Sequence, residues 1–433
     1  MSGRAMGWVT VALLFAGCAG VNYRDKYERY LEEGHKLPPS TAEEVKLQRQ
    51  AYVDAIERDS PFKEVLWDVA INGHRIARVT LRGDHVYVET RDYWLYAIEA
   101  KTGITKWALD VTRPIQFPPT VVHGLDDAMA AQRALIANIQ EKVGLAKEAG
   151  DKEAVTKLEQ DLKDGKNRLE TLMDKDVVYF MSQDVLWCLD RRHGVILWKK
   201  PLAYPPSTAA FATPDTIFLG TWDRKRVWAI NAKTRDESTF WRVWSNSATT
   251  PIYAEPSLYF AADDGKVHSV SLEGGSNWTY ACEAGVRGDL KVADRMLLVP
   301  SLDFALYGMD RYAGAVAWKF ESGSPISSQP QVSGATAFVR SDRIGLFAVE
   351  LATGKKKWMV PDGDRFLVRS KRLVYVLGPG HEILGIDDAS GEIRVRWNAN
   401  LFPILMTNET TPVLYLATPD GHVIAATESN EKY

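Results

Sequence analysis

Short stretches of alternating hydrophobic and polar residues recur along most of the chain. Residues 85–90 (HVYVET), 216–220 (TIFLG) and 373–377 (LVYVL) are rich in β-branched and aromatic residues, which favour β-strands. Each stretch has a further strand-like segment before it. Each is followed by a second apolar stretch, a polar turn and a last stretch. The pattern therefore predicts repeated units of about four strands each.

The turn and the last strand of these units share one spacing of glycine and tryptophan. Residues 97–107 (AIEAKTGITKW), 188–198 (CLDRRHGVILW), 308–318 (GMDRYAGAVAW) and 348–358 (AVELATGKKKW) all place glycine four residues before tryptophan. A looser copy, 385–397 (GIDDASGEIRVRW), has two additional residues before its tryptophan. Glycine adopts positive φ without strain, so we expect a hairpin turn at each of these glycines. They are Gly103, Gly194, Gly314, Gly354 and Gly391.

Tryptophans that share this register count the units. They are Trp67, Trp107, Trp198, Trp241, Trp278, Trp318, Trp358 and Trp397. They repeat about every 40 residues, which indicates a repeat architecture. The one long interval, 91 residues from Trp107 to Trp198, falls to 38 when the 53 residues 124–176 are removed. One large aromatic residue per unit is typical of packing between units rather than of a substrate platform.

The two ends of the repeat complete each other. The last unit, near residues 413–427, lacks a tryptophan strand, whereas Trp67 lies in a strand with no unit before it. If this N-terminal strand joins the last unit, eight complete four-stranded blades result. The sequence therefore predicts an all-β, eight-bladed β-propeller over residues 61–433, whose closure removes exposed sheet edges. An open solenoid is the alternative.

The repeat resembles that of the pyrroloquinoline-quinone (PQQ) dehydrogenase superfamily, whose signature is Ala-x-Asp-x-x-Thr-Gly-x-x-x-Trp. The resemblance implies an eight-bladed propeller and leaves the function open, because this fold hosts enzymes and binding modules alike. The quinoprotein enzymes have two adjacent cysteines, a bound Ca²⁺ and a catalytic aspartate. This chain has no adjacent cysteines, and residues 263–264 and 387–388, each an Asp-Asp pair, are typical of turns. We therefore expect no catalytic residue, no cofactor and no metal site.

The N-terminus has the features of a targeting segment. Residues 1–17 combine Arg4 with a short apolar run, which is typical of a secretory signal peptide. Residues 14–18 (LFAGC) resemble a bacterial lipobox, which implies acylation of Cys18. Ala19 in place of an aspartate implies sorting to the outer membrane, facing the periplasm. A plain signal peptide with a chance cysteine is the alternative.

Residues 18–60 are polar and predict a partly helical tether. Residues 40–43 (STAE) form a capping-box sequence that starts a helix running to about Arg58. This segment is interpreted as a spacer or as a docking element.

Residues 124–176 predict an antiparallel helical hairpin inserted between the first two strands of one blade. Apolar or small residues recur in steps of three and four, the heptad pattern of a coiled coil. They are Met129, Ile136, Ile139, Val143, Ala146, Val155, Leu158, Leu162, Gly165, Leu169 and Leu172, with Gln132 as a polar break. The hairpin is either a decoration or an arm that binds a partner. Outward-facing charges of the possible arm are Glu141, Lys142, Lys147, Glu148, Lys152 and Glu153.

Composition narrows the function classes. The 433 residues carry a formal charge of −3, and no helical basic signature points to nucleic acid. The histidines are scattered without zinc-ligand spacing. Cys188 and Cys282 fall in different units, which favours two separate buried thiols, although a bridge stays possible.

A lipobox followed by a PQQ-type propeller resembles the BamB-like lipoproteins. This resemblance implies a non-catalytic scaffold that docks through propeller loops onto a BamA-like factor in outer-membrane protein assembly. The long N-terminal segment and the insertion depart from the family pattern, so no contact residues are carried over. Two alternatives stay open: a PQQ-dependent quinoprotein dehydrogenase, and an envelope lipoprotein that binds carbohydrate or peptidoglycan.

Overall fold

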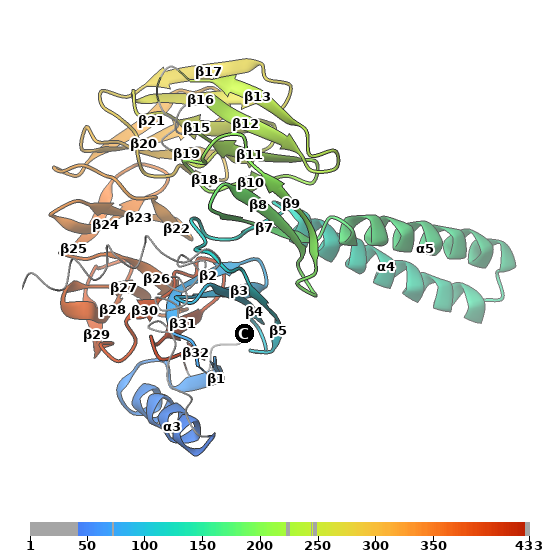
Figure 1. Ribbon diagram of the computed structural model, residues 1–433, viewed down its shortest axis with the longest axis horizontal. Coiled ribbons are helices and arrows are strands. Elements are labelled where there is room, and N and C mark those ends of the chain that lie inside the picture. Colours follow the sequence, from blue (N-terminus) through green and yellow to red (C-terminus); the bar gives the residue numbers. More distant parts are fainter. Residues whose placement is uncertain (1–41, 72, 222–225, 244, 246–248, 429–433) are drawn as a thin grey trace, which may run out of the picture.

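The computed structural model describes residues 42–428, except residues 72, 222–225, 244 and 246–248. Within this range the chain forms eight four-stranded antiparallel sheets, from which a helical hairpin projects (Figure 1). The predicted eight-bladed propeller is thereby confirmed. The predicted signal peptide and Cys18 lie outside the described residues.

Each blade uses four strands that are consecutive in the sheet. Blades 1 to 4 are β2 (Ile76–Arg82), β3 (His85–Thr90), β4 (Trp94–Glu99), β5 (Thr105–Asp110); β6 (Thr120–Val121), β7 (Val177–Ser182), β8 (Val185–Asp190), β9 (Ile196–Pro201); β10 (Phe211–Ala212), β11 (Thr216–Gly220), β12 (Arg226–Asn231), β13 (Glu237–Arg242); and β14 (Ile252–Ala254), β15 (Ser257–Ala261), β16 (Lys266–Ser271), β17 (Ser276–Ala281). Blades 5 to 8 are β18 (Lys291–Ala293), β19 (Met296–Pro300), β20 (Ala305–Asp310), β21 (Val316–Glu321); β22 (Gln331–Ser333), β23 (Thr336–Ser341), β24 (Gly345–Glu350), β25 (Lys356–Pro361); β26 (Arg365–Arg369), β27 (Val374–Leu377), β28 (Glu382–Ile386), β29 (Ile393–Asn398); and β30 (Ile404–Leu405), β31 (Val413–Ala417), β32 (His422–Thr427), β1 (Glu64–Ala70). A 3₁₀ turn, η1 (Pro379–His381), precedes β28.

The first strand of the propeller closes the last blade. β1 pairs antiparallel with β32, with Trp67 opposite Ala425. Eight buried hydrophobic clusters lie between the blades, one for each neighbouring pair, including blade 8 with blade 1. Because every blade buries both faces in this way, the sheets form one continuous ring. The predicted end-to-end closure is confirmed.

The repeated tryptophan and glycine meet across the blade boundaries. The Trp318 ring of blade 5 lies against Gly354 of blade 6, where a Cβ would stand 2.6 Å from the ring. The Trp318 indole N–H also donates to the Leu351 carbonyl, at 3.0 Å. Five glycines lie on the preceding blade's tryptophan with φ between 68° and 75°: Gly103, Gly194, Gly314, Gly354 and Gly391. The glycine thus serves both the turn and the approach of the ring.

Two tryptophans, Trp241 and Trp397, lie two residues beyond the position that Trp107 occupies in its blade. In blade 1, Trp107 pairs with Ala97 of the neighbouring strand. Trp241 pairs with Val227 and Trp397 pairs with Ile383. Val227 and Ile383 each lie two residues before the position that corresponds to Ala97. The displacement of Trp397 agrees with the two additional residues of its looser copy, and Trp241 is displaced in the same way. Residues two apart on a strand point to the same face, so both rings still face the layer between blades.

Replacing Gly354 by alanine is expected to lower the free energy of unfolding by about 2–4 kcal/mol, since the new Cβ adds backbone strain and a clash with Trp318. Urea unfolding measures the change. Gly144→Ala is the matched control: Gly144 lies in a helix with nothing within 4 Å of a Cβ, so this variant is expected to gain about 0.5–1 kcal/mol. Equal stability of Gly354→Ala and the wild type would show that the contact between Gly354 and Trp318 does not stabilise the propeller.

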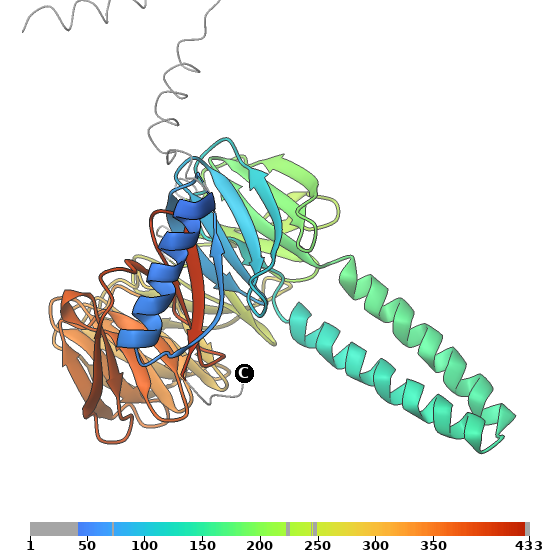
Figure 2. The same cartoon turned by 90° about the horizontal axis from the view of Figure 1, so that it is seen from below.

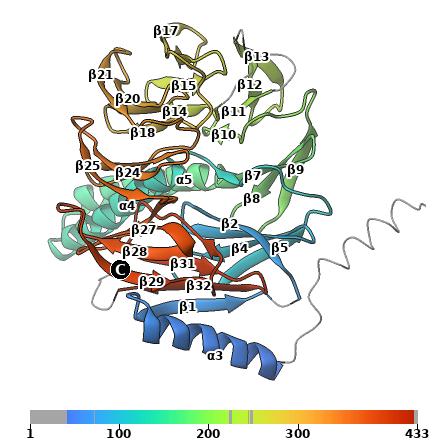
Figure 3. The same cartoon turned by 90° about the vertical axis from the view of Figure 1, so that its left-hand side faces the viewer.

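Three α-helices of the described residues lie outside the sheets. α3 (Ala42–Asp59) runs along β1, and α4 (Leu125–Glu148) and α5 (Lys152–Met173) form the hairpin between β6 and β7 (Figures 1 and 3). Both the helical hairpin and the helical N-terminal extension were predicted and are confirmed. Within the described part of the chain, no helix combines the length and the apolar character needed to span a membrane.

Candidate functional site

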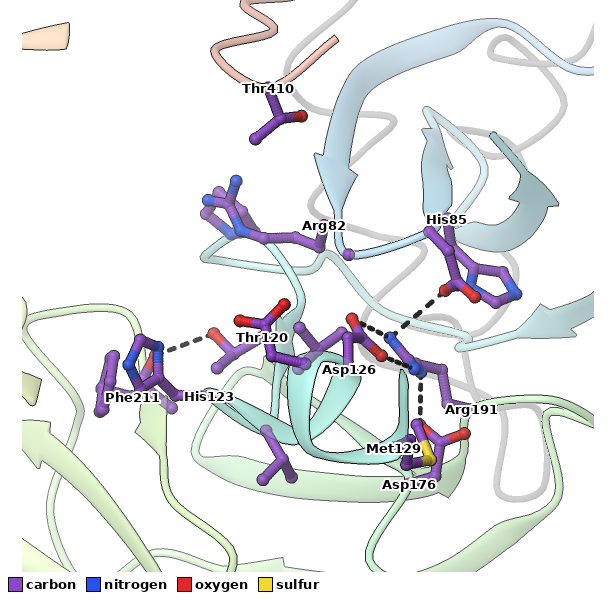
Figure 4. Close-up of a pocket in the computed structure, with 18 of the residues that line it drawn as sticks. Arg82, His85, Thr120, His123, Asp126, Met129, Asp176, Arg191, Phe211 and Thr410 are labelled. Carbon is purple, nitrogen blue, oxygen red and sulfur yellow. Dashed lines mark hydrogen bonds and ion pairs between the residues drawn. The ribbon is translucent and has the colours of Figure 1, made fainter. Parts of the chain in front are cut away.

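A cavity opens on the propeller where the hairpin is rooted. Its volume is about 1190 Å³ and it is open to solvent (Figure 4). Its walls include Thr120, Thr250 and Gln329 from near the innermost strands of three blades, and the first turns of α4. The hairpin therefore forms one wall of the cavity as well as an arm.

A cluster of carboxylates around the buried Arg191 fixes the root of the hairpin. Arg191, in the turn between β8 and β9, is 3% exposed, and its Nε lies 2.5 Å from Asp176 Oδ1, just after α5. Its Nη1 lies 3.0 Å from Asp126 Oδ2 in the first turn of α4 and 3.3 Å from Asp84 Oδ1 in the β2–β3 turn. Figure 4 shows Arg191 between Asp126 and Asp176. One guanidinium thus joins both ends of the hairpin to two blades.

Local sequence explains why this cluster forms. Gly83 has φ +57°, and a Cβ there would stand 2.5 Å from Asp126 Oδ2, so a side chain at this turn would exclude the carboxylate. Asp126 also lies in the first turn of α4, where the helix dipole favours a negative charge. The Arg191 carbonyl accepts the indole N–H of Trp107 at 2.8 Å. Arg191 therefore takes part both in the contact between blades 1 and 2 and in the attachment of the hairpin.

The carboxyl of Asp84 gives the site a pH dependence. A hydrogen bond with His85 and the nearby Arg191 lower the pKa of Asp84 to about 2. A depressed acid pKa adds stability above the unfolded value of about 4, and this stability is lost as the pH falls toward 2. Because Asp84 is largely exposed, we expect only about 1 kcal/mol. Urea unfolding at pH 6 and pH 3 should show that Asp84→Asn removes this part of the pH dependence; an unchanged difference would contradict it.

The cavity is lined by both polar and apolar side chains. The Asp289 carboxylate accepts the backbone N–H of Thr250 at 2.7 Å, and burial raises the pKa of Asp289. The side chain of Arg82 lies in the cavity (Figure 4). Among the described residues, no three His, Cys, Asp or Glu side chains are grouped so as to hold a metal ion.

The two described cysteines lie apart. Cys188 is in blade 2 and Cys282 follows β17 of blade 4, and both are buried without a disulfide. Burial raises the pKa of each thiol to about 12. Both side chains act as small hydrophobic residues in the clusters between blades.

The hairpin projects beyond the ring as two packed helices (Figures 1 and 2). Ile136 and Val143 are buried against α5, and Gln132 donates a hydrogen bond to the Gly165 carbonyl at 3.0 Å. Asp151 caps α5 by accepting the N–H of Ala154. All the residues expected in the seam are buried or half-buried: Met129, Gln132, Ile136, Ile139, Val143, Ala146, Val155, Leu158, Leu162, Gly165, Leu169 and Leu172.

The charged residues expected on the arm lie together at its far end. They are Glu141, Lys142, Lys147, Glu148, Lys152 and Glu153, all exposed. Within this group Lys147 forms an ion pair with Glu159 of α5, at 2.8 Å.

The sequence does not predict the Arg191 cluster or the cavity. The sequence offers only an aspartate two residues after Gly124, and no regular spacing relates Asp84, Asp126 and Asp176 to Arg191.

The fold and this site define the class of the protein: an eight-bladed propeller of PQQ-type repeats with an inserted helical arm. The family described as "Outer membrane protein assembly factor BamB" matches residues 24–238, 234–362 and 263–403. These segments cover most of the sequence, and the chain belongs to this family.

Solved structures share the fold. BamB from Moraxella catarrhalis is 15% identical, with a TM-score of 0.59 over 85% of this chain and 99% of that one. The computationally designed Ika8 protein is 11% identical, with a TM-score of 0.57 over 84% and 99% of the two chains. The comparison with curated protein sequences found no match.

Proposed function

We propose that the protein is a lipid-anchored, non-catalytic scaffold of outer-membrane protein assembly, facing the periplasm, and that the helical hairpin is a partner-binding arm. One observation carries the proposal: the hairpin is fixed at its root by ion pairs with the buried Arg191, while its far half extends away from the propeller (Figure 2). An arm held in one orientation loses less conformational entropy when it binds. Its partner would be an envelope protein such as a BamA-like factor.

Acylation of Cys18 would supply the anchor. Several acyl chains hold a protein on a membrane far more stably than a single chain does. The tether would then lead into α3, whose Tyr52 hydroxyl donates to Asp420 of blade 8 at 2.8 Å. This contact supports a defined junction between tether and propeller.

The non-catalytic role is supported by the residues of the cavity. Its buried charges at the hairpin root are committed to one another, and the described cysteines lie in separate blades. A scaffold needs no reactive group there. Binding of PQQ with Ca²⁺ by the purified protein, together with dye-linked oxidation of an alcohol or sugar, would contradict the proposal.

Deleting residues 125–175 and joining the strands by a short turn is expected to leave the propeller folded. Most of the hairpin packs on itself, and only its root, including Leu125 and Met129, joins the cluster between blades 2 and 3. The same deletion is expected to abolish pull-down of the envelope partner. Circular dichroism and thermal unfolding measure the first outcome, and affinity capture from detergent-solubilised envelopes measures the second.

A tip variant controls for indirect effects of the deletion. Replacing Glu141, Lys142, Glu148 and Glu153 by alanine leaves the Arg191 cluster intact and changes only exposed positions.

If the protein that lacks residues 125–175 unfolds, the hairpin is part of the core and the arm proposal fails. If the deleted protein folds and still captures its partner, the partner binds elsewhere.

A further inference from the structure

α3 covers the outer rim of blade 8. It lies beside β1, the strand that closes the ring (Figure 3). Its inner face buries Ala55 and Ile56, and Ile56 packs in the cluster between blades 7 and 8, with Phe402. α3 is therefore a docked element whose departure would leave the pairing of β1 with β32 in place.

A group of polar side chains lies at this contact. Arg49 of α3 forms an ion pair with Asp68 of β1, and the Tyr52 hydroxyl donates to Asp420, in the β31–β32 turn. The Tyr52 ring also lies 5.1 Å from the ring of His422, which is only 2% exposed. Docking of α3 thus places an aromatic ring over a buried imidazole.

Of the groups at this contact, His422 has the side chain whose ordinary pKa lies nearest to neutral pH. Burial lowers the pKa of His422; the nearby Asp420 and Asp68 raise it less, and Arg49 lowers it further. Among the described residues, its Nδ1 has no hydrogen-bond partner. A protonated imidazole here would be a poorly solvated cation, which an undocked helix would expose to water.

We propose that α3 is a pH-sensitive latch, which is docked on blade 8 when His422 is neutral and released when His422 is protonated. A histidine whose folded pKa is lowered adds docking free energy above its unfolded value of about 6.5, and this contribution is lost as the pH falls below that value. With one proton involved, the docking equilibrium constant falls by at most about tenfold per pH unit.

Release of the latch lengthens the connection to the N-terminal segment. α3 has 18 residues, so the released segment would span roughly 27 Å as a helix and at most roughly 60 Å as a fully extended chain. The use of this reach at a membrane rests on the lipid anchor of the proposed function. The pH-dependent release of α3 does not depend on the lipid anchor, so it can be tested independently of the proposed function.

The test measures the distance between α3 and the propeller in the full chain. Spin labels at Leu47→Cys and Leu401→Cys report it by pulsed electron resonance at pH 7.5 and pH 5.5. Both positions are exposed, and Leu401 lies beside Ala55 and Asp59 of α3. We expect one short distance at pH 7.5 and a second, longer population at pH 5.5. A single unchanged distance at both values would overturn the latch, as would loss of near-ultraviolet circular dichroism over the same range, which indicates global unfolding.

Variants assign the response to His422. In His422→Asn the longer population should stay constant between pH 7.5 and 5.5, whereas His193→Asn, at an exposed turn, should respond like the parent. A pH response retained in His422→Asn overturns the proposal. If His422→Asn does not fold, Tyr52→Phe serves instead. It keeps the ring but loses the bond to Asp420, so release should occur at higher pH; an unshifted midpoint would overturn the latch.

Discussion

Replacing Arg191 by methionine is expected to lower the free energy of unfolding by about 3–5 kcal/mol. The substitution leaves the Asp176 carboxylate, 5% exposed, without its 2.5 Å partner and removes the common partner of Asp84 and Asp126. Loss of one member of a buried ion cluster leaves uncompensated charge in a poorly solvated place. Urea unfolding followed by tryptophan fluorescence measures the loss.

The same variant should loosen the hairpin, because Arg191 joins both of its ends to the ring. A spin-label pair across the arm and blade 1 is expected to give a broader distance distribution than in the wild type. Arg192→Met is the control: Arg192 contacts the same Asp176 at 3.0 Å but is 32% exposed, so a loss of about 0–1 kcal/mol is expected. Equal losses in the two variants would contradict the central role of Arg191.

Replacing Trp318 by alanine is expected to lower the free energy of unfolding by about 3–5 kcal/mol. The ring is 8% exposed and fills the space between Gly308 of its own blade and Gly354 of the next. Its indole N–H bond to the Leu351 carbonyl is lost as well. Denaturant unfolding measures the change.

Leu401→Ala is the control for Trp318→Ala. Leu401 is a large apolar residue that is 58% exposed, and its truncation should change stability by no more than about 0.5 kcal/mol. If Trp318→Ala costs less than about 1 kcal/mol, the tryptophan repeat does not hold the blades together.

The number of blades could be predicted from the sequence because the same spacing of glycine and tryptophan recurs in several blades. Glycine four residues before tryptophan marks a left-handed turn, and the same pair meets across each boundary where both residues are present. The pattern was less reliable where the glycine is absent. Arg235 holds that turn with φ 68° and lies 5.7 Å from the Trp198 ring, while Trp241 stands two residues late. A side chain larger than glycine thus changes how the ring is covered.

The hairpin was predictable for a related reason, since its heptad spacing extends through both helices. The Arg191 cluster was not predictable. Asp84, Asp126, Asp176 and Arg191 come from separate turns, and only the closed ring and the inserted hairpin bring them together. The polar contacts under α3 are equally distant in sequence: Tyr52 and Asp420 lie 368 residues apart.

Crosslinking in the intact envelope tests the scaffold account most directly. The wild-type chain and the chain lacking residues 125–175 would each be crosslinked in cells and the products identified by mass spectrometry. The account predicts that a component of outer-membrane protein assembly is crosslinked to the wild-type chain through the hairpin or the adjoining propeller loops, and that it is lost or strongly reduced in the deletion. Recovery of the same component with both chains at equal yield, or of no assembly component with either, would contradict it.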